Sequence, residues 1–236
     1  MTTDTLPTVF VPGLFCTPRL YADQLPALWQ IGPVSVADHR RDDSIAGIAQ
    51  RLLDSAPPHF GLVGISMGGY VALEVMRRAP ERVDRLALLC TSARPDTPEQ
   101  TQKRRGQIAS AREGHFDKVV DDTFPLLFAP SRGQDDALHR LVRTMADETG
   151  VDGFVRQQTA NMGRVDSRPH LAAIRCPTLV LAGADDQLIP PEMATELANA
   201  IPGARHVQLP DCGHLACLDK PDEVTRALLT LWRDRT

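Results

Sequence analysis

Ser66 lies in the G-x-S-x-G segment of residues 64–68, a pattern that presents a serine hydroxyl as a nucleophile where a strand turns into a helix. An apolar run at 60–63 precedes this segment, and a helical pattern over 70–78 follows it. The sequence therefore predicts a nucleophile elbow, a tight turn that lifts the Ser66 Oγ clear of the sheet edge. A glycine-rich turn with an idle serine is the alternative.

A serine nucleophile needs a general base, and the base needs a carboxylate that orients it. Of the seven histidines, His214 has the expected surroundings. It follows Gly213 in a loop between a predicted strand at 204–209 and a predicted terminal helix at 221–233. His39 follows a predicted strand end, so it is a candidate for the border of the pocket.

Two adjacent aspartates compete for the role of the orienting acid. Asp185 and Asp186 both follow the apolar run 178–182, which predicts a buried strand. Asp186 has the better spacing, because it lies three residues after Gly183 and four before Pro190. The sequence favours Asp186 and keeps Asp185 as the alternative.

These residues lie between elements that alternate along the chain, and such alternation is typical of parallel βαβ units. Ser44 has the position of an N-cap for the second helix. The predicted strands are 8–11, 34–37, 60–65, 83–90, 178–182 and 204–209, and the predicted helices are 19–29, 45–54, 67–78, 191–200 and 221–233.

The alternation stops between about Arg94 and Pro169. That stretch has helix-like patterns and no convincing strand. The patterns cover 99–113, 116–123, 135–147 and 151–162, with a break at Gly150. A helical cap over the active site is the favoured interpretation, and a peripheral helical excursion is the alternative.

Taken in order, these landmarks resemble the α/β-hydrolase superfamily, and specifically its small bacterial-type esterases, lactonases and C–C hydrolases. A strand and loop at 9–13 come before the Ser66 elbow, the Asp186 loop and the His214 loop. The resemblance implies an α/β-hydrolase fold, with a mostly parallel central sheet flanked by helices. It implies a core at 1–93 and 170–236 and a helical cap insertion at 94–169. The chain departs from the common pattern by having Pro12 before Gly13.

The resemblance also implies the chemistry: a Ser66–His214–Asp186 catalytic triad that works through an acyl-enzyme. The expected oxyanion hole consists of the backbone N–H groups of Met67 and Leu14, with Phe15 as the alternative to Leu14. The expected activity is carboxylesterase-like, the hydrolysis of a small carboxylic ester or lactone without a cofactor. The alternatives are C–C bond hydrolysis or lyase chemistry on a small carbonyl substrate, and a weakly catalytic ligand receptor with this fold.

Four aromatic side chains are candidates for lining the substrate pocket: Phe15, Phe124, Phe128 and Phe154. Rings at the spacings of the last three also fit the core of the insertion itself. Arg132, Arg156 and Arg164 are candidates for binding a substrate carboxylate. The run of basic residues 103–105 is offset by nearby acidic residues, so a solvated helix face is the favoured interpretation and an anion site is the alternative.

Composition limits the classes of partner. The chain has 236 residues and a net charge of −4, which favours a small-molecule acyl substrate over nucleic acid. Five cysteines, without C-x-x-C spacing, indicate a reduced, cytoplasmic chain without a metal site. No signal peptide and no apolar run of about 18 residues is present, so no membrane partner is expected.

Overall fold

The computed structural model describes residues 5–234, and a sheet of six parallel strands forms its centre. The strands lie in the order β2-β1-β3-β4-β5-β6. Their bounds are β1 (Thr8–Val11), β2 (Val34–Val36), β3 (Phe60–Ile65), β4 (Val83–Leu89), β5 (Thr178–Gly183) and β6 (Arg205–Leu209). The predicted sheet is thus confirmed, and within the described residues every strand pair in it is parallel.

The order of the strands reverses at β1, which pairs with β2 on one side and with β3 on the other. Val9 lies opposite Ser35 and Leu62 in these two pairings. Open α/β sheets bind ligands outside the carboxyl ends of the strands next to such a reversal, because the flanking connections there leave for opposite faces. The loop after β1 and the turn after β3 therefore meet at the edge where a site is expected.

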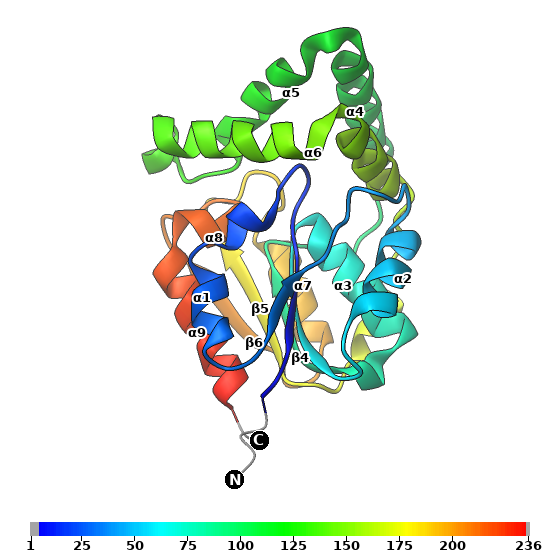
Figure 1. Ribbon diagram of the computed structural model, residues 1–236, viewed down its shortest axis with the longest axis vertical. Coiled ribbons are helices and arrows are strands. Elements are labelled where there is room, and N and C mark those ends of the chain that lie inside the picture. Colours follow the sequence, from blue (N-terminus) through cyan, green and yellow to red (C-terminus); the bar gives the residue numbers. More distant parts are fainter. Residues whose placement is uncertain (1–4, 235–236) are drawn as a thin grey trace.

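Helices cover both faces of the sheet (Figure 1). Helices α1 (Gln24–Trp29) and α9 (Pro221–Arg233) pack on one face, where Phe10 and Val63 are buried. The other face buries Val9 and Leu62 against a second group of helices. This second group is α2 (Ile45–Ser55), α3 (Met67–Arg78) and α7 (Glu192–Ala200).

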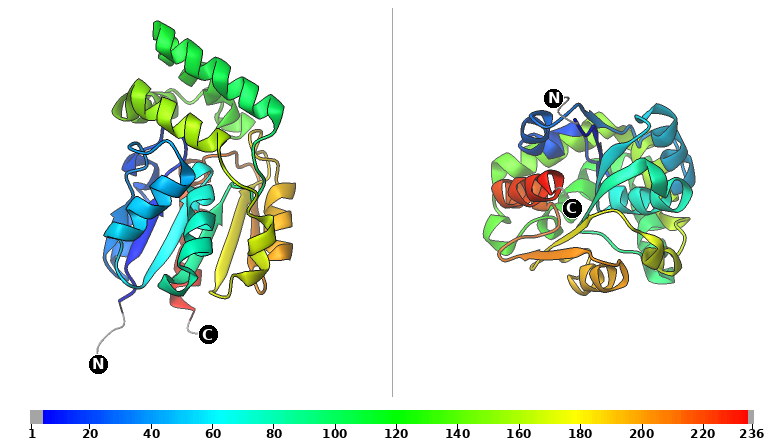
Figure 2. Two further views of the ribbon diagram at one scale, coloured as in Figure 1. Left: turned by 90° about the vertical axis from the view of Figure 1, so that its right-hand side faces the viewer. Right: turned by 90° about the horizontal axis from the view of Figure 1, so that it is seen from below.

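A helical insertion, defined as residues 94–169, lies between β4 and β5 and forms a separate layer over one edge of the sheet (Figures 1 and 2). At its base, the Ser167 N–H donates a 2.8 Å hydrogen bond to the Ala93 carbonyl oxygen, which brings its two ends together. Its elements are α4 (Pro98–Ser110), η3 (Ala111–His115), α5 (Phe116–Thr123), η4 (Phe124–Leu126), η5 (Pro130–Arg132), α6 (Asp136–Met162) and the start of η6 (Arg168–Ala173).

Most predicted boundaries agree with the observed ones to within a residue or two. Ser44 caps α2 as predicted, because its Oγ accepts a 3.1 Å hydrogen bond from the Gly47 N–H. The predicted helix over 19–29 is instead a 3₁₀ turn, η1 (Pro18–Tyr21), followed by α1. Within the described residues, the sequence patterns missed five short elements: η2 (Pro80–Arg82), η4, η5, η6 and α8 (Ala216–Asp219). No helix within residues 5–234 is both long and apolar enough to cross a membrane.

Candidate active site

Ser66 lies in a strained turn between β3 and α3. Its φ is 54° and its ψ is −120°, a conformation that L-residues rarely adopt outside functional sites. The turn requires glycine on both sides: a Cβ on Gly64 would lie 2.3 Å from the Gly68 carbonyl oxygen, and a Cβ on Gly68 would lie 2.0 Å from that of Val11. The strand and the helix can therefore approach closely enough to expose the Ser66 Oγ.

Three side chains from three different loops meet at the carboxyl edge of the sheet. The His214 Nε2 lies 2.8 Å from the Ser66 Oγ, and the His214 Nδ1 lies 2.8 Å from the Asp186 Oδ2. A carboxylate only accepts hydrogen bonds, so Nδ1 carries the proton and Nε2 is left to accept one from Ser66. The arrangement has the geometry needed to activate a serine by general base catalysis.

Asp186 is buried, and its orientation is fixed by the loop after β5. Its Oδ1 accepts 2.9 Å hydrogen bonds from the N–H groups of Leu188 and Ile189, while its Oδ2 faces His214. Asp185 instead donates its backbone N–H to the Cys212 carbonyl oxygen, and its side chain makes no hydrogen bond within the described part of the chain. The structure thus brings Asp186, and not Asp185, to the histidine.

Met67 and Leu14, two residues that line a pocket together with Ser66, have backbone N–H groups that could bind an anion. Met67 is the first residue of α3, where the helix dipole favours negative charge. Leu14 follows Gly13 in the loop after β1, and its N–H has no hydrogen-bond partner among residues 5–234. The Phe15 N–H, the alternative considered for Leu14, donates to the Gln157 Oε1 at 2.9 Å. Of the two loop N–H groups, only that of Leu14 is free to bind an oxyanion.

A pocket of about 220 Å³ opens in front of Ser66, between the sheet edge and the helical insertion. Its lining is apolar near the serine and polar along α4. The residues that line it are Gly13, Leu14, Phe15, Ser66, Met67, Tyr70, Gln100, Lys103, Arg104, Gln107, Thr123, Leu126, Leu127, Asn161, Gln187, Leu188, Ile189, His214 and Leu215.

Of the four predicted pocket aromatics, Phe15 lines this pocket and the other three do not. Phe124, Phe128 and Phe154 are buried in the hydrophobic core. The rings of Phe124 and Phe128 pack against each other with centroids 5.3 Å apart, and Phe154 packs on Phe116 at 5.0 Å. These side chains therefore form the interior of the insertion and its contact with the core, which corrects the prediction.

The basic residues also differ from their prediction. Arg164 is buried in an ion pair with Asp96, Arg132 pairs with Asp135, and the Arg156 Nε donates to the Arg40 carbonyl oxygen at 2.7 Å. All three lie outside the pocket lining, which instead includes Lys103 and Arg104, two residues of the run for which a solvated helix face is the favoured interpretation. Neither residue carries a sequence signal that would distinguish a pocket wall from a surface.

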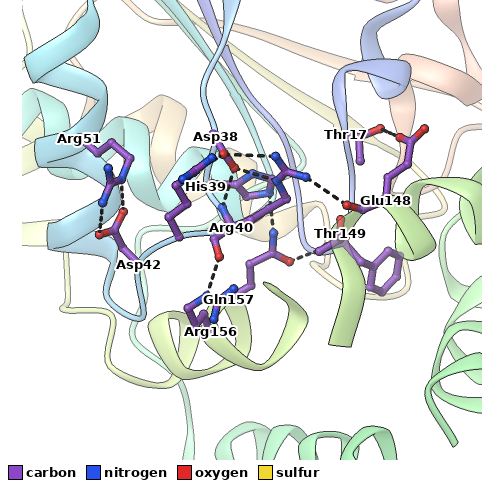
Figure 3. Close-up of polar contacts among 12 residues, drawn as sticks. Thr17, Asp38, His39, Arg40, Asp42, Arg51, Glu148, Thr149, Arg156 and Gln157 are labelled. Atoms are coloured by element: carbon purple, nitrogen blue, oxygen red, sulfur yellow. Dashed lines mark hydrogen bonds and ion pairs between the residues drawn. The ribbon is translucent and has the colours of Figure 1, made fainter. Parts of the chain in front are cut away.

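The helical insertion contacts the loop after β1 through α6. Figure 3 shows Gln157 reaching from α6 to His39, whose Nε2 lies 3.1 Å away. The same His39 Nε2 lies 2.9 Å from the Gly13 carbonyl oxygen, so the two side chains contact both ends of the Gly13–Phe15 turn. Burial lowers the pKa of His39 from 6.5 to about 4. His39 is therefore a neutral ring behind the loop.

The insertion also holds the loop of His214. The buried Asp219 Oδ2 accepts hydrogen bonds from Gly213 N–H at 2.7 Å and from Ala129 N–H at 2.9 Å. The Leu215 N–H donates to the Leu127 carbonyl oxygen at 2.8 Å. A Cβ on Gly213 would lie 2.4 Å from the Phe128 carbonyl carbon, so this close contact requires glycine. These contacts hold the loop that carries His214 between helix α8 and residues 127–129.

None of the five cysteines is bonded to another. Burial raises the pKa of Cys16 to about 12 and also raises that of Cys90, so both thiols stay protonated near neutral pH. Across residues 5–234, no group of three or more His, Cys, Asp or Glu side chains is placed to hold a metal ion.

Comparison with known proteins identifies relatives of this arrangement. A family model described as alpha/beta hydrolase fold matches residues 35–221. A pimeloyl-acyl-carrier-protein methyl ester esterase of Aromatoleum aromaticum is 30% identical over 196 residues, which are 78% of this chain and 78% of that protein. A thermophilic esterase of Thermogutta terrifontis, solved with malate bound, is 28% identical with a TM-score of 0.88, over 97% of this chain and 89% of that one. The enol-lactonase of Burkholderia xenovorans is 25% identical, also with a TM-score of 0.88, over 98% and 92%.

Proposed function

We propose that this chain, which belongs to the alpha/beta hydrolase fold family, is a serine hydrolase that cleaves a small carboxylic ester or lactone. The observation that carries the proposal is the chain of two 2.8 Å contacts from the Ser66 Oγ through His214 to Asp186, at the edge of a 220 Å³ pocket. The esterase and lactonase relatives support it.

In the first half of the proposed reaction, the Ser66 Oγ attacks the acyl carbon while its proton passes to the His214 Nε2. Asp186 keeps the other ring nitrogen protonated and stabilises the imidazolium that forms. The C–O bond of the ester then breaks, and His214 returns the proton to the leaving alkoxide. The product of this half is an acyl group on Ser66.

In the second half, water attacks the acyl carbon and gives one proton to the His214 Nε2. The Ser66 Oγ leaves with that proton, and the carboxylic acid is released. Both tetrahedral intermediates carry an oxyanion, which the N–H groups of Met67 and Leu14 are proposed to bind. The free N–H of Leu14 and the helix terminus at Met67 support this assignment.

We further propose that the helical insertion acts as a cap, with residues 1–93 and 170–236 as the hydrolase core. The bond between Ser167 and Ala93 closes the base of the insertion at the proposed boundary. Gln100, Thr123 and Leu127 line the pocket from the insertion, so the residues that select the substrate are expected there.

Two measurements on one protein sample test the proposal. p-Nitrophenyl acetate and butyrate should release p-nitrophenol, with an initial burst if deacylation is slower than acylation. A fluorophosphonate probe should label the chain once, and peptide mass spectrometry should locate the label on Ser66. A folded sample that neither turns over these esters nor takes the label would contradict the proposal. Ester binding without turnover would favour the ligand-receptor alternative.

A further inference from the structure

The pocket in front of Ser66 carries positive charge, although the formal net charge of the chain is −4. Two cationic side chains of α4, Lys103 and Arg104, are part of its lining. No Asp or Glu is among the described residues that line it. A concave site with one sign of charge attracts ligands of the opposite sign.

Arg104 is held in place by a shared carboxylate. Its Nε donates to the Asp96 Oδ2 at 3.1 Å, and its Nη1 donates to the Gln158 Oε1 at 2.6 Å. Arg164 pairs with the same Asp96, so two guanidinium groups share one carboxylate and the cluster keeps a positive charge. The Arg104 Nη2 makes no hydrogen bond within residues 5–234, so its donors remain unused.

Lys103 lies on the same wall, one residue earlier in α4. Its side chain has neither an ion pair nor a hydrogen bond within the part of the chain that the structure describes. Within the described residues, no carboxylate therefore compensates the charge of this ammonium group.

The same wall also contains an amide without a partner. Asn161 is only 2% exposed, and its Oδ1 has no hydrogen-bond partner among residues 5–234. An amide oxygen accepts hydrogen bonds, so a hydroxyl or N–H group of a ligand can pair with it, whereas an alkyl chain or a carboxylate oxygen cannot. Because Phe15 and Leu215 near the serine are apolar, the pocket changes from apolar to polar along its length.

We infer that the preferred substrate is an ester or lactone whose acyl part ends in a carboxylate, and that Lys103 and the Arg104 Nη2 bind this carboxylate. The inference rests on the proposed function, because it assigns the far end of the substrate whose acyl carbon Ser66 attacks. The apolar segment next to Ser66 holds the methylene groups between the two ends. Lys103 and Arg104 are then specificity-determining residues for the reaction.

Two esters of equal acyl length separate charge from size: the mono-p-nitrophenyl ester of adipic acid and p-nitrophenyl hexanoate. We expect the wild-type kcat/KM to be about tenfold higher for the adipate ester, mainly through a lower KM. Lys103→Gln should reduce that preference about tenfold, by lowering kcat/KM for the adipate ester far more than for hexanoate.

Arg105→Gln is the matched control, because Arg105 is an exposed cation on the same helix and lies outside the pocket lining. It should leave the preference for the adipate ester unchanged. Faster turnover of hexanoate than of the adipate ester, or equal effects of the two substitutions, would overturn the inference while leaving the proposed hydrolase function intact. Failure to hydrolyse either ester would overturn the proposed function and the inference with it.

Discussion

The side chain of Gln157 accepts a 2.9 Å hydrogen bond from the backbone N–H of Phe15, which joins the helical insertion to the loop after β1. Phe15 has a φ of 45°, in the left-handed region, so its conformation depends on contacts that hold it there. With this N–H occupied, the neighbouring N–H of Leu14 is the one left for an oxyanion. One contact from the insertion therefore sets the geometry of the proposed oxyanion hole.

We predict that Gln157→Ala lowers kcat for p-nitrophenyl butyrate by about tenfold or more, with a smaller change in KM. Loss of the amide frees the loop, and small misplacements of catalytic groups cost rate more than binding. Thr159→Ala is the control, because Thr159 is exposed on the same helix and its Oγ1 bonds only within α6. An unchanged kcat in Gln157→Ala would show that the loop holds its geometry without α6.

Replacing Ser66, the proposed nucleophile, should remove turnover and keep the fold. Ser66→Ala is expected to reduce ester hydrolysis by about 10³-fold or more, as is usual for a triad residue. Alanine adds no bulk to the turn, so the melting temperature should stay close to the wild-type value. Near wild-type rates in a normally folded variant would disprove the assignment of Ser66.

The paired aspartates should respond very differently to substitution. Asp186→Asn should lower kcat by about 10²- to 10⁴-fold, because an amide no longer favours the tautomer with a proton on the His214 Nδ1. Asp185→Asn should cost less than about tenfold, since its side chain takes no part in the hydrogen bonds to His214. Steady-state kinetics on one ester measures kcat for both variants. Equal losses of kcat would contradict the assignment of Asp186 as the orienting acid.

Asp219 should contribute to stability through two hydrogen bonds. Asp219→Ala leaves the buried N–H groups of Gly213 and Ala129 without an acceptor, so we expect the free energy of unfolding to fall by about 3 kcal/mol. Asp219→Asn keeps one oxygen for both donors, and its loss should be nearer 1 kcal/mol. Urea denaturation measures both values. Equal losses in the two variants would mean that the carboxylate charge, and not the pair of hydrogen bonds, matters.

His39 should make stability depend on pH. Its pKa is about 4 in the folded chain and about 6.5 when unfolded, so the unfolded chain binds the extra proton between these values. The stabilisation is complete above pH 6.5 and is lost as the pH falls toward 4. We expect a loss of about 2 kcal/mol between pH 7.5 and pH 5 from this residue.

Urea denaturation at these two pH values, for wild type and His39→Gln, isolates that contribution. The variant lacks the titrating ring and should lose less stability on acidification. The neighbouring Asp38 does not contribute to this difference. Hydrogen bonds from Arg40 hold the pKa of its carboxyl well below the usual range, so Asp38 changes the free energy of unfolding only below about pH 4. Identical pH dependence in the two proteins would contradict the prediction.

The sequence predicts those parts of the structure that are encoded locally. Strand and helix periodicity locate the sheet, and the glycines around Ser66 and before His214 mark the two turns that present the proposed catalytic groups. The choice of Asp186 over Asp185 follows from spacing within one loop. Its position beside His214 agrees with that choice.

The residues that line the pocket could not be predicted from the sequence pattern of a single segment. Phe124, Phe128 and Phe154 recur at helical spacing, which is the same for a ring facing a pocket and for a ring facing a core. Gln157 and Asp219 act on partners 142 and 90 residues away, Phe15 and Ala129. Such contacts depend on how the insertion packs against the sheet domain. The spacing of residues within a single segment does not predict that packing.

The two attachments of the insertion, at Phe15 and at Gly213, limit how this chain can be recombined with its relatives. A chimaera that exchanges residues 94–169 for another insertion also removes the acceptor for the Phe15 N–H and the segment that meets Gly213. Such a graft would change turnover as well as substrate choice, unless the donor insertion supplies an amide at the position of Gln157 and a backbone that fits against Gly213. Grafts that transplant these anchor points together with the helices are the ones expected to exchange specificity without loss of rate.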